Sequence, residues 1–436
     1  MLLLRSVWIF IVCFLSWGPI IAPLPLLGSL GGILKILGYM NSGLLLMFHS
    51  MLLLGYGSLV TLKLMSKNST KTLAAISVTT IGSIVLSAVV ALLTCSPEWV
   101  KNPIAQTSLS SSLSTNLLHP KGVSFSKWIS PASACGELSL YDNETTTYRS
   151  SLPPIGPGSR DDSFMNPFTR FIMSGFNDDE PTRLKAVFFS VPDQYRRNND
   201  RRPGLVIFIH GGGWWTGDPR ASPGPCHAEF AFSQGWSYAH IDYRLLRNGW
   251  SGDVQLQDVK DGIGHLLDTY ATVVDLRKVV VIGSSAGANL GLTASYQLNN
   301  EKANLTHPII AGVLVVAPST SVTIGTGPNS IPRWAGAWNE RAATERFCEG
   351  VFDCNKRLSP LEHVTKYTPQ TVIIHGVSDE WYAVHHSRAL AKKLARNNIP
   401  YVYLEPPLMP HCIDLAQNSI PYQMGSSAFK ELMQSL

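Results

Sequence analysis

The sequence lacks the residue patterns of several common function classes. None of its seven cysteines forms a C-x-x-C pair, which argues against a zinc ribbon or a thioredoxin-like redox site. It contains no H-x-x-x-H pair, no acidic calcium loop and no nucleotide-binding fingerprint. Charged residues make up only 15% of the chain, and no Lys/Arg block suggests a nucleic-acid patch. We therefore expect no metal, no cofactor and no nucleic-acid partner.

Hydrophobic residues, in contrast, are concentrated near the N-terminus. Three runs without a charged residue cover residues 7–27, 38–62 and 72–95. Each is long enough to cross a bilayer as a helix, which needs about 20 apolar residues. The first run alone could be a signal peptide, because Arg5 precedes it, but two further runs follow. Residues 1–95 are therefore predicted to form a transmembrane region of about three helices; buried helices of a soluble domain are the alternative.

The basic residues indicate an orientation. Arg5 precedes the first run, and three lysines lie in the segment 63–71 between the second and third runs. Because positive charge stays on the cytoplasmic side, residues after 95 are expected in the lumen of the endoplasmic reticulum or outside the cell. Asn143 and Asn304 begin N-x-S/T sequons, so both are possible glycosylation sites there.

The rest of the chain divides into two parts. Residues 96–180 are rich in Ser, Pro, Thr and Asn, which predicts a linker with little regular structure. Within it, the apolar segment 164–176 packs on the catalytic domain or forms a cap. From 181 to 436, short apolar runs alternate with longer amphipathic ones. This alternation predicts an α/β domain with a mainly parallel sheet covered by helices on both faces.

The expected elements of this domain can be placed by residue number. Strands are predicted at 184–191, 205–209, 237–241, 278–282, 309–316, 371–374 and 401–404. Helices are predicted at 254–270, 288–298, 382–396 and 423–436. The segment 318–370 is expected to form part of a lid or pocket. It contains Cys348 and Cys354, which are close enough in sequence to bridge in an oxidising compartment.

The strongest chemical signal is Gly283-Ser284-Ser285-Ala286-Gly287, between a buried strand and a helix. This is the strand–turn–helix context of a nucleophile elbow, and it predicts Ser285 as a nucleophile. The turn is sharp, so the positions that flank it require small residues, and Gly283 and Gly287 meet this requirement. The alternative is an ordinary tight turn between a strand and a helix.

The second signal is His210-Gly211-Gly212-Gly213, directly after a predicted strand. Acyl transfer creates an oxyanion that aimed backbone N–H groups can stabilise. Glycine lets the backbone approach a substrate closely. We assign Gly212, Gly213 and Ala286 as the oxyanion hole, and His210 and Gly211 as structural residues of the loop.

A serine nucleophile needs a base, and the base needs an acid that orients it. Asp379 and His411 each follow a predicted strand, in the chain order Ser, Asp, His that this architecture uses. They are therefore the predicted acid and base, with Glu380 as the alternative acid. His375, His385 and His386 are interpreted as structural, and His363 lies in the insert before the acid strand without the strand context of a catalytic base.

The segments HGGGWW, GSSAG, HGVSDE and MPHC together resemble the hormone-sensitive-lipase-like and carboxylesterase-like branch of the α/β-hydrolases. The resemblance spans roughly residues 180–436 and implies an α/β-hydrolase fold with Ser285, Asp379 and His411 as its triad. A membrane anchor with a lumenal hydrolase is similar to arylacetamide and cholesteryl-ester deacetylases. Ser284 departs from the Asp common in those enzymes and is closer to feruloyl-esterase-like or isoprenylcysteine-methylesterase-like relatives.

The sequence therefore predicts a membrane-anchored serine carboxylester hydrolase that acts on an apolar or lipid-like ester. An amide-directed hydrolase with the same triad, such as a formamidase or deacetylase, is the first alternative. A non-catalytic binding protein on the same scaffold is the second. The sequence indicates neither the natural substrate nor the oligomeric state.

Overall fold

The structure is a computed structural model. It describes residues 138–149, 183–196, 202–220, 223–303, 308–322, 340–377, 379, 381–405, 411 and 420–436. The three apolar runs predicted to span a membrane lie outside these residues. Among the helices of the described residues, none combines the length and the hydropathy that a bilayer crossing requires.

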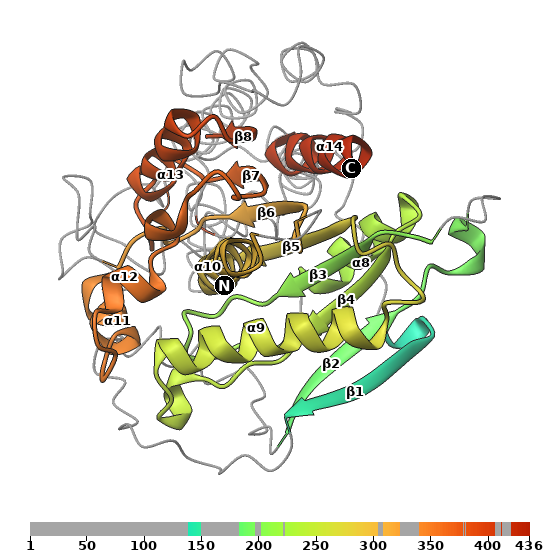
Figure 1. The fold of residues 1–436 in the computed structure, drawn as a ribbon, viewed down its shortest axis with the longest axis horizontal. Helices are drawn as coiled ribbons and strands as arrows, with labels where there is room; N and C mark the ends of the chain where they lie inside the picture. The colour runs from blue at the N-terminus through green and yellow to red at the C-terminus, as the bar shows by residue number, and fades with distance from the viewer. Residues whose placement is uncertain are drawn as a thin grey trace, which may run out of the picture.

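In the described part of the chain, eight strands form one sheet (Figure 1). Their spatial order is β1 (Asn143–Arg149), β2 (Leu184–Phe189), β4 (Ser237–Ile241), β3 (Leu205–Ile209), β5 (Val279–Ser284), β6 (Gly312–Val316), β7 (Gln370–Ile374) and β8 (Tyr401–Leu404). β2 pairs antiparallel with both β1 and β4, whereas β4, β3, β5, β6, β7 and β8 pair in parallel. The predicted mainly parallel sheet is confirmed.

Strand β1 corrects the predicted domain boundary at residue 181. Its sequence NETTTYR lies within the segment predicted as an irregular linker, yet it pairs with β2 at the edge of the sheet. The strand has no apolar alternation because all of its residues are partly or fully exposed. Threonine favours extended backbone, and a polar edge strand discourages pairing with other chains. Hydrophobic periodicity alone therefore missed it.

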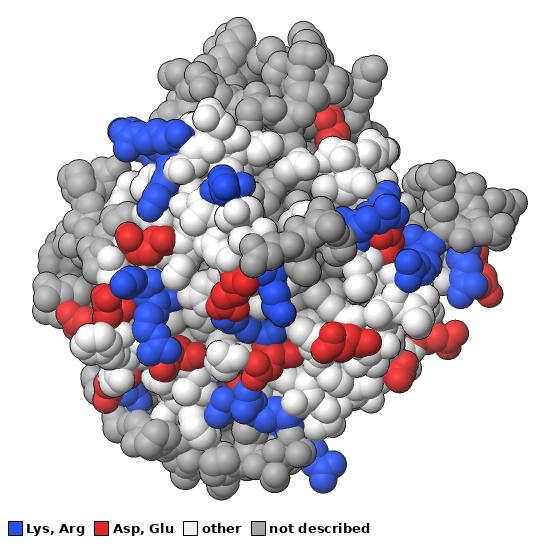
Figure 2. Space-filling model, in the orientation of Figure 1, with Lys and Arg blue, Asp and Glu red and all other residues white. Residues whose placement is uncertain are grey.

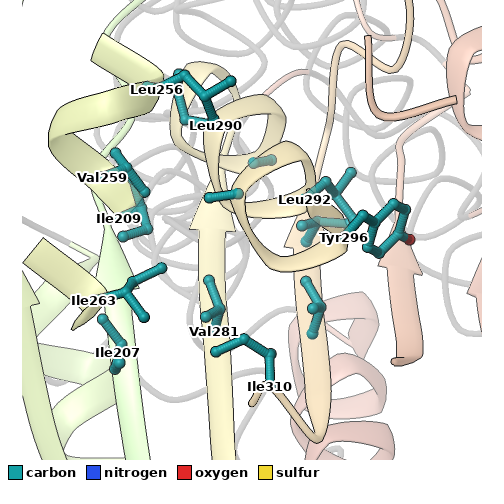
Figure 3. Packing of buried hydrophobic residues seen from close by; sticks show 14 of the residues in the cluster. Ile207, Ile209, Leu256, Val259, Ile263, Val281, Leu290, Leu292, Tyr296 and Ile310 are labelled. Atoms are coloured by element: carbon teal, nitrogen blue, oxygen red, sulfur yellow. The ribbon is translucent and has the colours of Figure 1, made fainter. Parts of the chain in front are cut away.

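Helices cover both faces of the sheet, as predicted (Figure 1). One apolar cluster joins one face to α9 (Gly252–Thr269), α10 (Ala286–Glu301) and α13 (His385–Arg396). A second cluster joins the opposite face to α8 (Gly224–Ser233) and α14 (Ile420–Ser435). In Figure 3, Val259 and Ile263 of α9 lie against Ile207 and Ile209 of β3. The central strands are buried on both faces, which explains their continuous runs of Val, Ile and Phe.

Two short helices, α11 (Glu340–Phe347) and α12 (Cys354–Leu358), lie in the segment predicted as a lid or pocket. Cys348 and Cys354 form the disulfide that their spacing allowed, and it joins the end of α11 to the start of α12. Cys226 is disulfide-bonded as well. Short 3-10 helices complete the described elements: Leu138–Leu140, Asp193–Tyr195, Leu246–Asn248 and Pro360–His363.

The topology brings distant parts of the sequence to one edge of the sheet. β3 and β5 are neighbouring parallel strands, and their last residues are Ile209 and Ser284. The residues that follow, His210 and Ser285, therefore emerge side by side. β7 and β8 run in the same direction, so the segments after them emerge at this edge too.

Candidate active site

Ser285 occupies the turn between β5 and α10. Its backbone has φ 54° and ψ −117°, a conformation that L-residues with a side chain rarely adopt. The Ser285 N–H donates to the carbonyl of Val316 at 2.8 Å, which anchors the turn to the neighbouring strand β6. Strained backbone of this kind persists only where its surroundings hold it, and it is frequent at functional sites.

The glycines of the turn are required by close backbone contacts. A Cβ on Gly283 would lie 2.3 Å from the carbonyl oxygen of Gly287. A Cβ on Gly287 would lie 2.2 Å from the carbonyl oxygen of Ile209 and 2.3 Å from that of His210. All three distances are far inside van der Waals contact with backbone that cannot move easily. The start of α10 therefore packs directly on the end of β3.

The loop 210–214 lies against the Ser285 turn. A Cβ on Gly211 would lie 2.8 Å from the carbonyl oxygen of Ser284 and 3.4 Å from Cβ of Ser285. Gly212 and Gly213 have φ of 122° and 62°, which turn the backbone sharply. Within the described residues, the N–H groups of Gly212, Gly213 and Ala286 donate to no protein acceptor. They are therefore available to a bound oxyanion.

The stacked rings of His210 and Tyr243 support this loop. His210 stacks on Tyr243 with ring centroids 4.2 Å apart, and the Tyr243 hydroxyl donates to the His210 carbonyl at 2.8 Å. The Nδ1 of His210 donates to the carbonyl of Gly211 at 2.8 Å. Burial lowers the pKa of His210 to about 4, so the ring is neutral at physiological pH. The His210 ring thus contacts Gly211 and Tyr243, whereas the Ser285 hydroxyl bonds to His411.

Trp214 fixes the far end of the loop. Its carbonyl accepts hydrogen bonds from the backbone N–H of Leu246 at 2.9 Å and from Nε2 of Gln255 at 2.8 Å. Its indole ring is fully buried and stacks on Phe347 of α11, with centroids 4.3 Å apart. An edge-on contact to Tyr382, at 5.9 Å, connects the loop to the Asp379 segment.

The structure brings Ser285, His411 and Asp379 into one line of hydrogen bonds. Nε2 of His411 lies 2.7 Å from Oγ of Ser285, and Nδ1 of His411 lies 2.7 Å from Oδ2 of Asp379. All three side chains are buried. With Nδ1–H donated to the carboxylate, Nε2 is left as the acceptor that a base requires. This geometry suits removal of the hydroxyl proton from Ser285.

Four N–H groups converge on Asp379. Its Oδ1 accepts from the backbone N–H groups of Trp381 at 2.8 Å and Tyr382 at 2.9 Å. Its Oδ2 faces His411 and, at 3.1 Å, Nε2 of His375. Burial alone would raise the pKa of this carboxyl, but His411 and the hydrogen bond from His375 hold it well below its usual range. Asp379 is therefore ionised.

Two contacts around the site were not predicted from the sequence. The indole of Trp381, which is partly exposed, lies parallel to the His411 ring with centroids 5.4 Å apart. His375, which the sequence analysis placed outside the site, contacts Asp379 directly. The HGVSDE segment did contain a signal for His375, because a residue at the end of a strand beside the acid must face the same edge.

The other candidate residues lie elsewhere. Asn143 begins β1 and is exposed, whereas Asn304 and Glu380 lie outside the described residues. His363 and His386 contact neither Ser285 nor Asp379: they bond to residues of α10 and α12, and to Thr320. No group of three His, Cys, Asp or Glu side chains suited to a metal ion occurs in the described portion.

Comparison with known proteins places this geometry in context. Residues 193–394 match the model of the BD-FAE family. The chain is similar to Esterase LipC of Mycobacterium tuberculosis, with 27% identity over 252 residues that cover 54% of this chain and 58% of the relative. It is also similar to the probable carboxylic ester hydrolase LipM of the same organism, with 26% identity over 49% of this chain and 52% of the relative. The chain therefore spans between half and three-fifths of the length of these two relatives.

Among solved structures, the chain is similar to an acetyl ester-xyloside bifunctional hydrolase from Caldicellulosiruptor lactoaceticus. The TM-score is 0.48 and the sequence identity 18%, over 66% of this chain and 98% of that structure.

Proposed function

Because this chain belongs to the carboxylesterase-like branch of the α/β-hydrolase superfamily, we propose that it is a serine carboxylester hydrolase. The observation that carries the proposal is the Ser285–His411–Asp379 hydrogen-bond line beside three N–H donors that bond to no acceptor in the described part of the chain. A nucleophile, a base, an orienting acid and oxyanion donors at one place are what acyl transfer from an ester requires. We expect the reaction to need no cofactor.

The reaction proceeds in two steps. Nε2 of His411 takes the proton as Oγ of Ser285 attacks the ester carbonyl, and the N–H groups of Gly212, Gly213 and Ala286 hold the resulting oxyanion. The His411 imidazolium then gives its proton to the leaving alcohol, and the acyl group remains on Ser285. Water, activated by His411, attacks the acyl-enzyme and releases the acid.

Replacing the nucleophile tests this function. We expect Ser285→Ala to lower the rate of p-nitrophenyl ester hydrolysis by about a thousandfold or more, because the acyl-enzyme cannot form. Ser284→Ala is the matched control, since it removes a neighbouring buried hydroxyl that lies outside the hydrogen-bond line. A fluorophosphonate probe should label the wild type and Ser284→Ala but not Ser285→Ala. Equal hydrolysis by wild type and Ser285→Ala would refute the proposal.

The substrate is proposed to be an apolar or lipid-like ester. The support is the expected membrane region at 1–95, which would hold the site near lipid. We expect turnover of p-nitrophenyl esters of medium chain length to exceed that of the matching p-nitroanilides by at least about a hundredfold. Faster turnover of the anilide would favour the amide-directed alternative.

The catalytic domain is proposed to lie in the lumen of the endoplasmic reticulum or outside the cell. Its support is the Cys348–Cys354 disulfide, since such bonds persist in oxidising compartments, and the exposed Asn143 sequon. Endoglycosidase treatment should lower the apparent mass of the wild type. Asn143→Gln should lack the mass of one glycan before the treatment. Asn68→Gln is the control, because its sequon falls in the loop expected on the cytoplasmic side. This location would be contradicted if the protein carried no glycan and its catalytic domain were cleaved by a protease in the cytosol of intact cells.

A further inference from the structure

A second buried histidine contacts the acid of the site. His375 follows the last residue of β7 and is completely buried. Its Nε2 lies 3.1 Å from Oδ2 of Asp379, the same oxygen that receives Nδ1 of His411. Two imidazole rings therefore share one carboxylate oxygen, and the proposed mechanism uses only one of them.

The contacts of His375 define which nitrogen carries the proton. Nε2 also lies 3.0 Å from the carbonyl oxygen of Tyr382. A carbonyl and an ionised carboxylate are both acceptors, so Nε2 must be a donor. Nδ1 lies 2.7 Å from the hydroxyl of Ser387 on α13, which can donate to it. The neutral ring with its proton on Nε2 satisfies all three contacts.

We infer that His375 is a positioning residue, which fixes the Asp379 carboxylate through a neutral N–H donor so that Oδ2 faces His411. This inference rests on the proposed function, because it assigns His375 a task in the same reaction. The backbone N–H groups of Trp381 and Tyr382 hold only Oδ1. His375 is a second contact to Oδ2, in addition to His411.

A neutral donor suits this task better than a cation. An Arg or Lys at this place would neutralise Asp379, and the carboxylate would then stabilise the His411 imidazolium less. A neutral N–H orients the oxygen and leaves most of its charge available. Among the described residues, the titratable side chains that contact Asp379 are those of His375 and His411, and the titratable side chain that contacts His375 is that of Asp379.

Removing the donor has a defined sign. In His375→Phe the Asp379 anion loses a hydrogen bond and attracts a proton on His411 more strongly. His411 then stays protonated to higher pH, so the acid limb of the pH–rate profile moves upward by about half a unit. Because the carboxylate is also less well oriented, kcat should fall by about tenfold while KM changes less than about twofold.

The experiment uses the full-length protein and two readouts: p-nitrophenyl ester hydrolysis and the rate of fluorophosphonate labelling, each measured from pH 5 to 9. His375→Gln places an amide N–H near the position that Nε2 occupies in the wild type. This variant should recover most of the activity and the acid limb of the wild-type pH–rate profile. His375→Asn is too short to reach and should behave like His375→Phe. His386→Gln is the control, because it changes a buried histidine on α13 that bonds to Thr320 and not to Asp379.

The outcomes separate the two proposals. If the wild type is not labelled at Ser285, the proposed function fails and this inference with it. If the wild type is labelled, but the Phe and Asn variants keep its acid limb and kcat, only the positioning role of His375 is refuted. If His375→Phe does not fold, the comparison of Gln with Asn decides, and equal profiles for these two would overturn the inference.

Discussion

The two halves of the site are held in different ways. The nucleophile half, Ser285 with the loop 210–214, is fixed by backbone packed on backbone, and a Cβ on Gly211, Gly212, Gly283 or Gly287 would overlap backbone atoms. The acid–base half, Asp379 with His411, is fixed by side-chain and N–H hydrogen bonds that include His375 and Trp381.

This difference predicts different responses to substitution. A turn whose backbone packs on other backbone is destabilised when a side-chain atom is added, because the neighbouring carbonyl groups cannot move aside. A hydrogen-bonded carboxylate can be changed in chemistry while the fold survives. Adding an atom to a glycine of the nucleophile half should therefore reduce stability and activity together, whereas changing the carboxylate of the acid–base half should reduce activity with little loss of stability.

The largest expected effect lies in the acid–base half. Asp379→Asn keeps the size of the side chain but removes the charge that stabilises the His411 imidazolium. We expect kcat to fall by about a thousandfold to ten-thousandfold, with a change in Tm of only a few degrees. Ester hydrolysis and thermal unfolding measure the two quantities. Activity within tenfold of wild type would remove Asp379 from its assigned role and leave Glu380 as the acid.

The second test adds one methyl group to the nucleophile half. Gly287→Ala would place Cβ 2.2 Å from the Ile209 carbonyl oxygen, so we expect a loss of about 3 kcal/mol in the free energy of unfolding. Fluorophosphonate labelling should fall with it. Gly291→Ala on the same helix is the control, because its Cβ would meet the Val281 side chain at 3.1 Å and no backbone. Similar urea-unfolding curves for the two variants would contradict backbone control of this half.

A smaller effect is expected from the support of the loop. Phe347→Leu removes the ring that stacks on Trp214, which should cost about 1 to 1.5 kcal/mol of stability. Because Trp214 ends the loop, we also expect kcat to fall by a few fold. Phe352→Leu, in the same segment but 88% exposed, should change neither. If both variants behave alike in urea unfolding and ester hydrolysis, the stack does not stabilise the loop.

The same comparison explains what the sequence could predict. The nucleophile half is nearly contiguous with the strands that carry it, so GSSAG and HGGG could be identified from local spacing. Asp379 and His411 could be named from chain order and strand context. The contact of His375 with Asp379 depends on how the segment after β7 turns back, which local spacing does not encode.

The fold shows the same limit. Short apolar runs predicted the buried strands, and β3, β4 and β8 match their predicted bounds to the residue. β1 was missed because its stability comes from pairing with β2 and not from burial of its own side chains. α8 was missed because its sequence GPCHAEFAFS opens with Gly and Pro and has no strong helical periodicity.

The smallest expected effect is a change in the free energy of unfolding with pH. Burial lowers the pKa of His210 to about 4 and that of His240, which lies on β4, to about 3. Below pH 6.5 the unfolded chain binds protons that these buried rings do not, so their stability contribution falls as the pH drops from about 6.5 toward 4. Asp379 has a strongly lowered pKa, so its contribution is lost only at far lower pH. As the pH falls, these two histidines should therefore destabilise the fold before Asp379 does.

A difference measurement isolates this effect, because Asp242 acts in the opposite sense. Burial raises the pKa of Asp242 to about 6, so its protonation partly offsets the loss in the same range. We expect His240→Phe to reduce the loss of unfolding free energy between pH 6 and 5 by about 1 kcal/mol relative to wild type. Urea unfolding at the two pH values measures it. The same loss in both proteins would mean that His240 takes up its proton in the folded state, and that the strand beside the nucleophile half tolerates a buried charge.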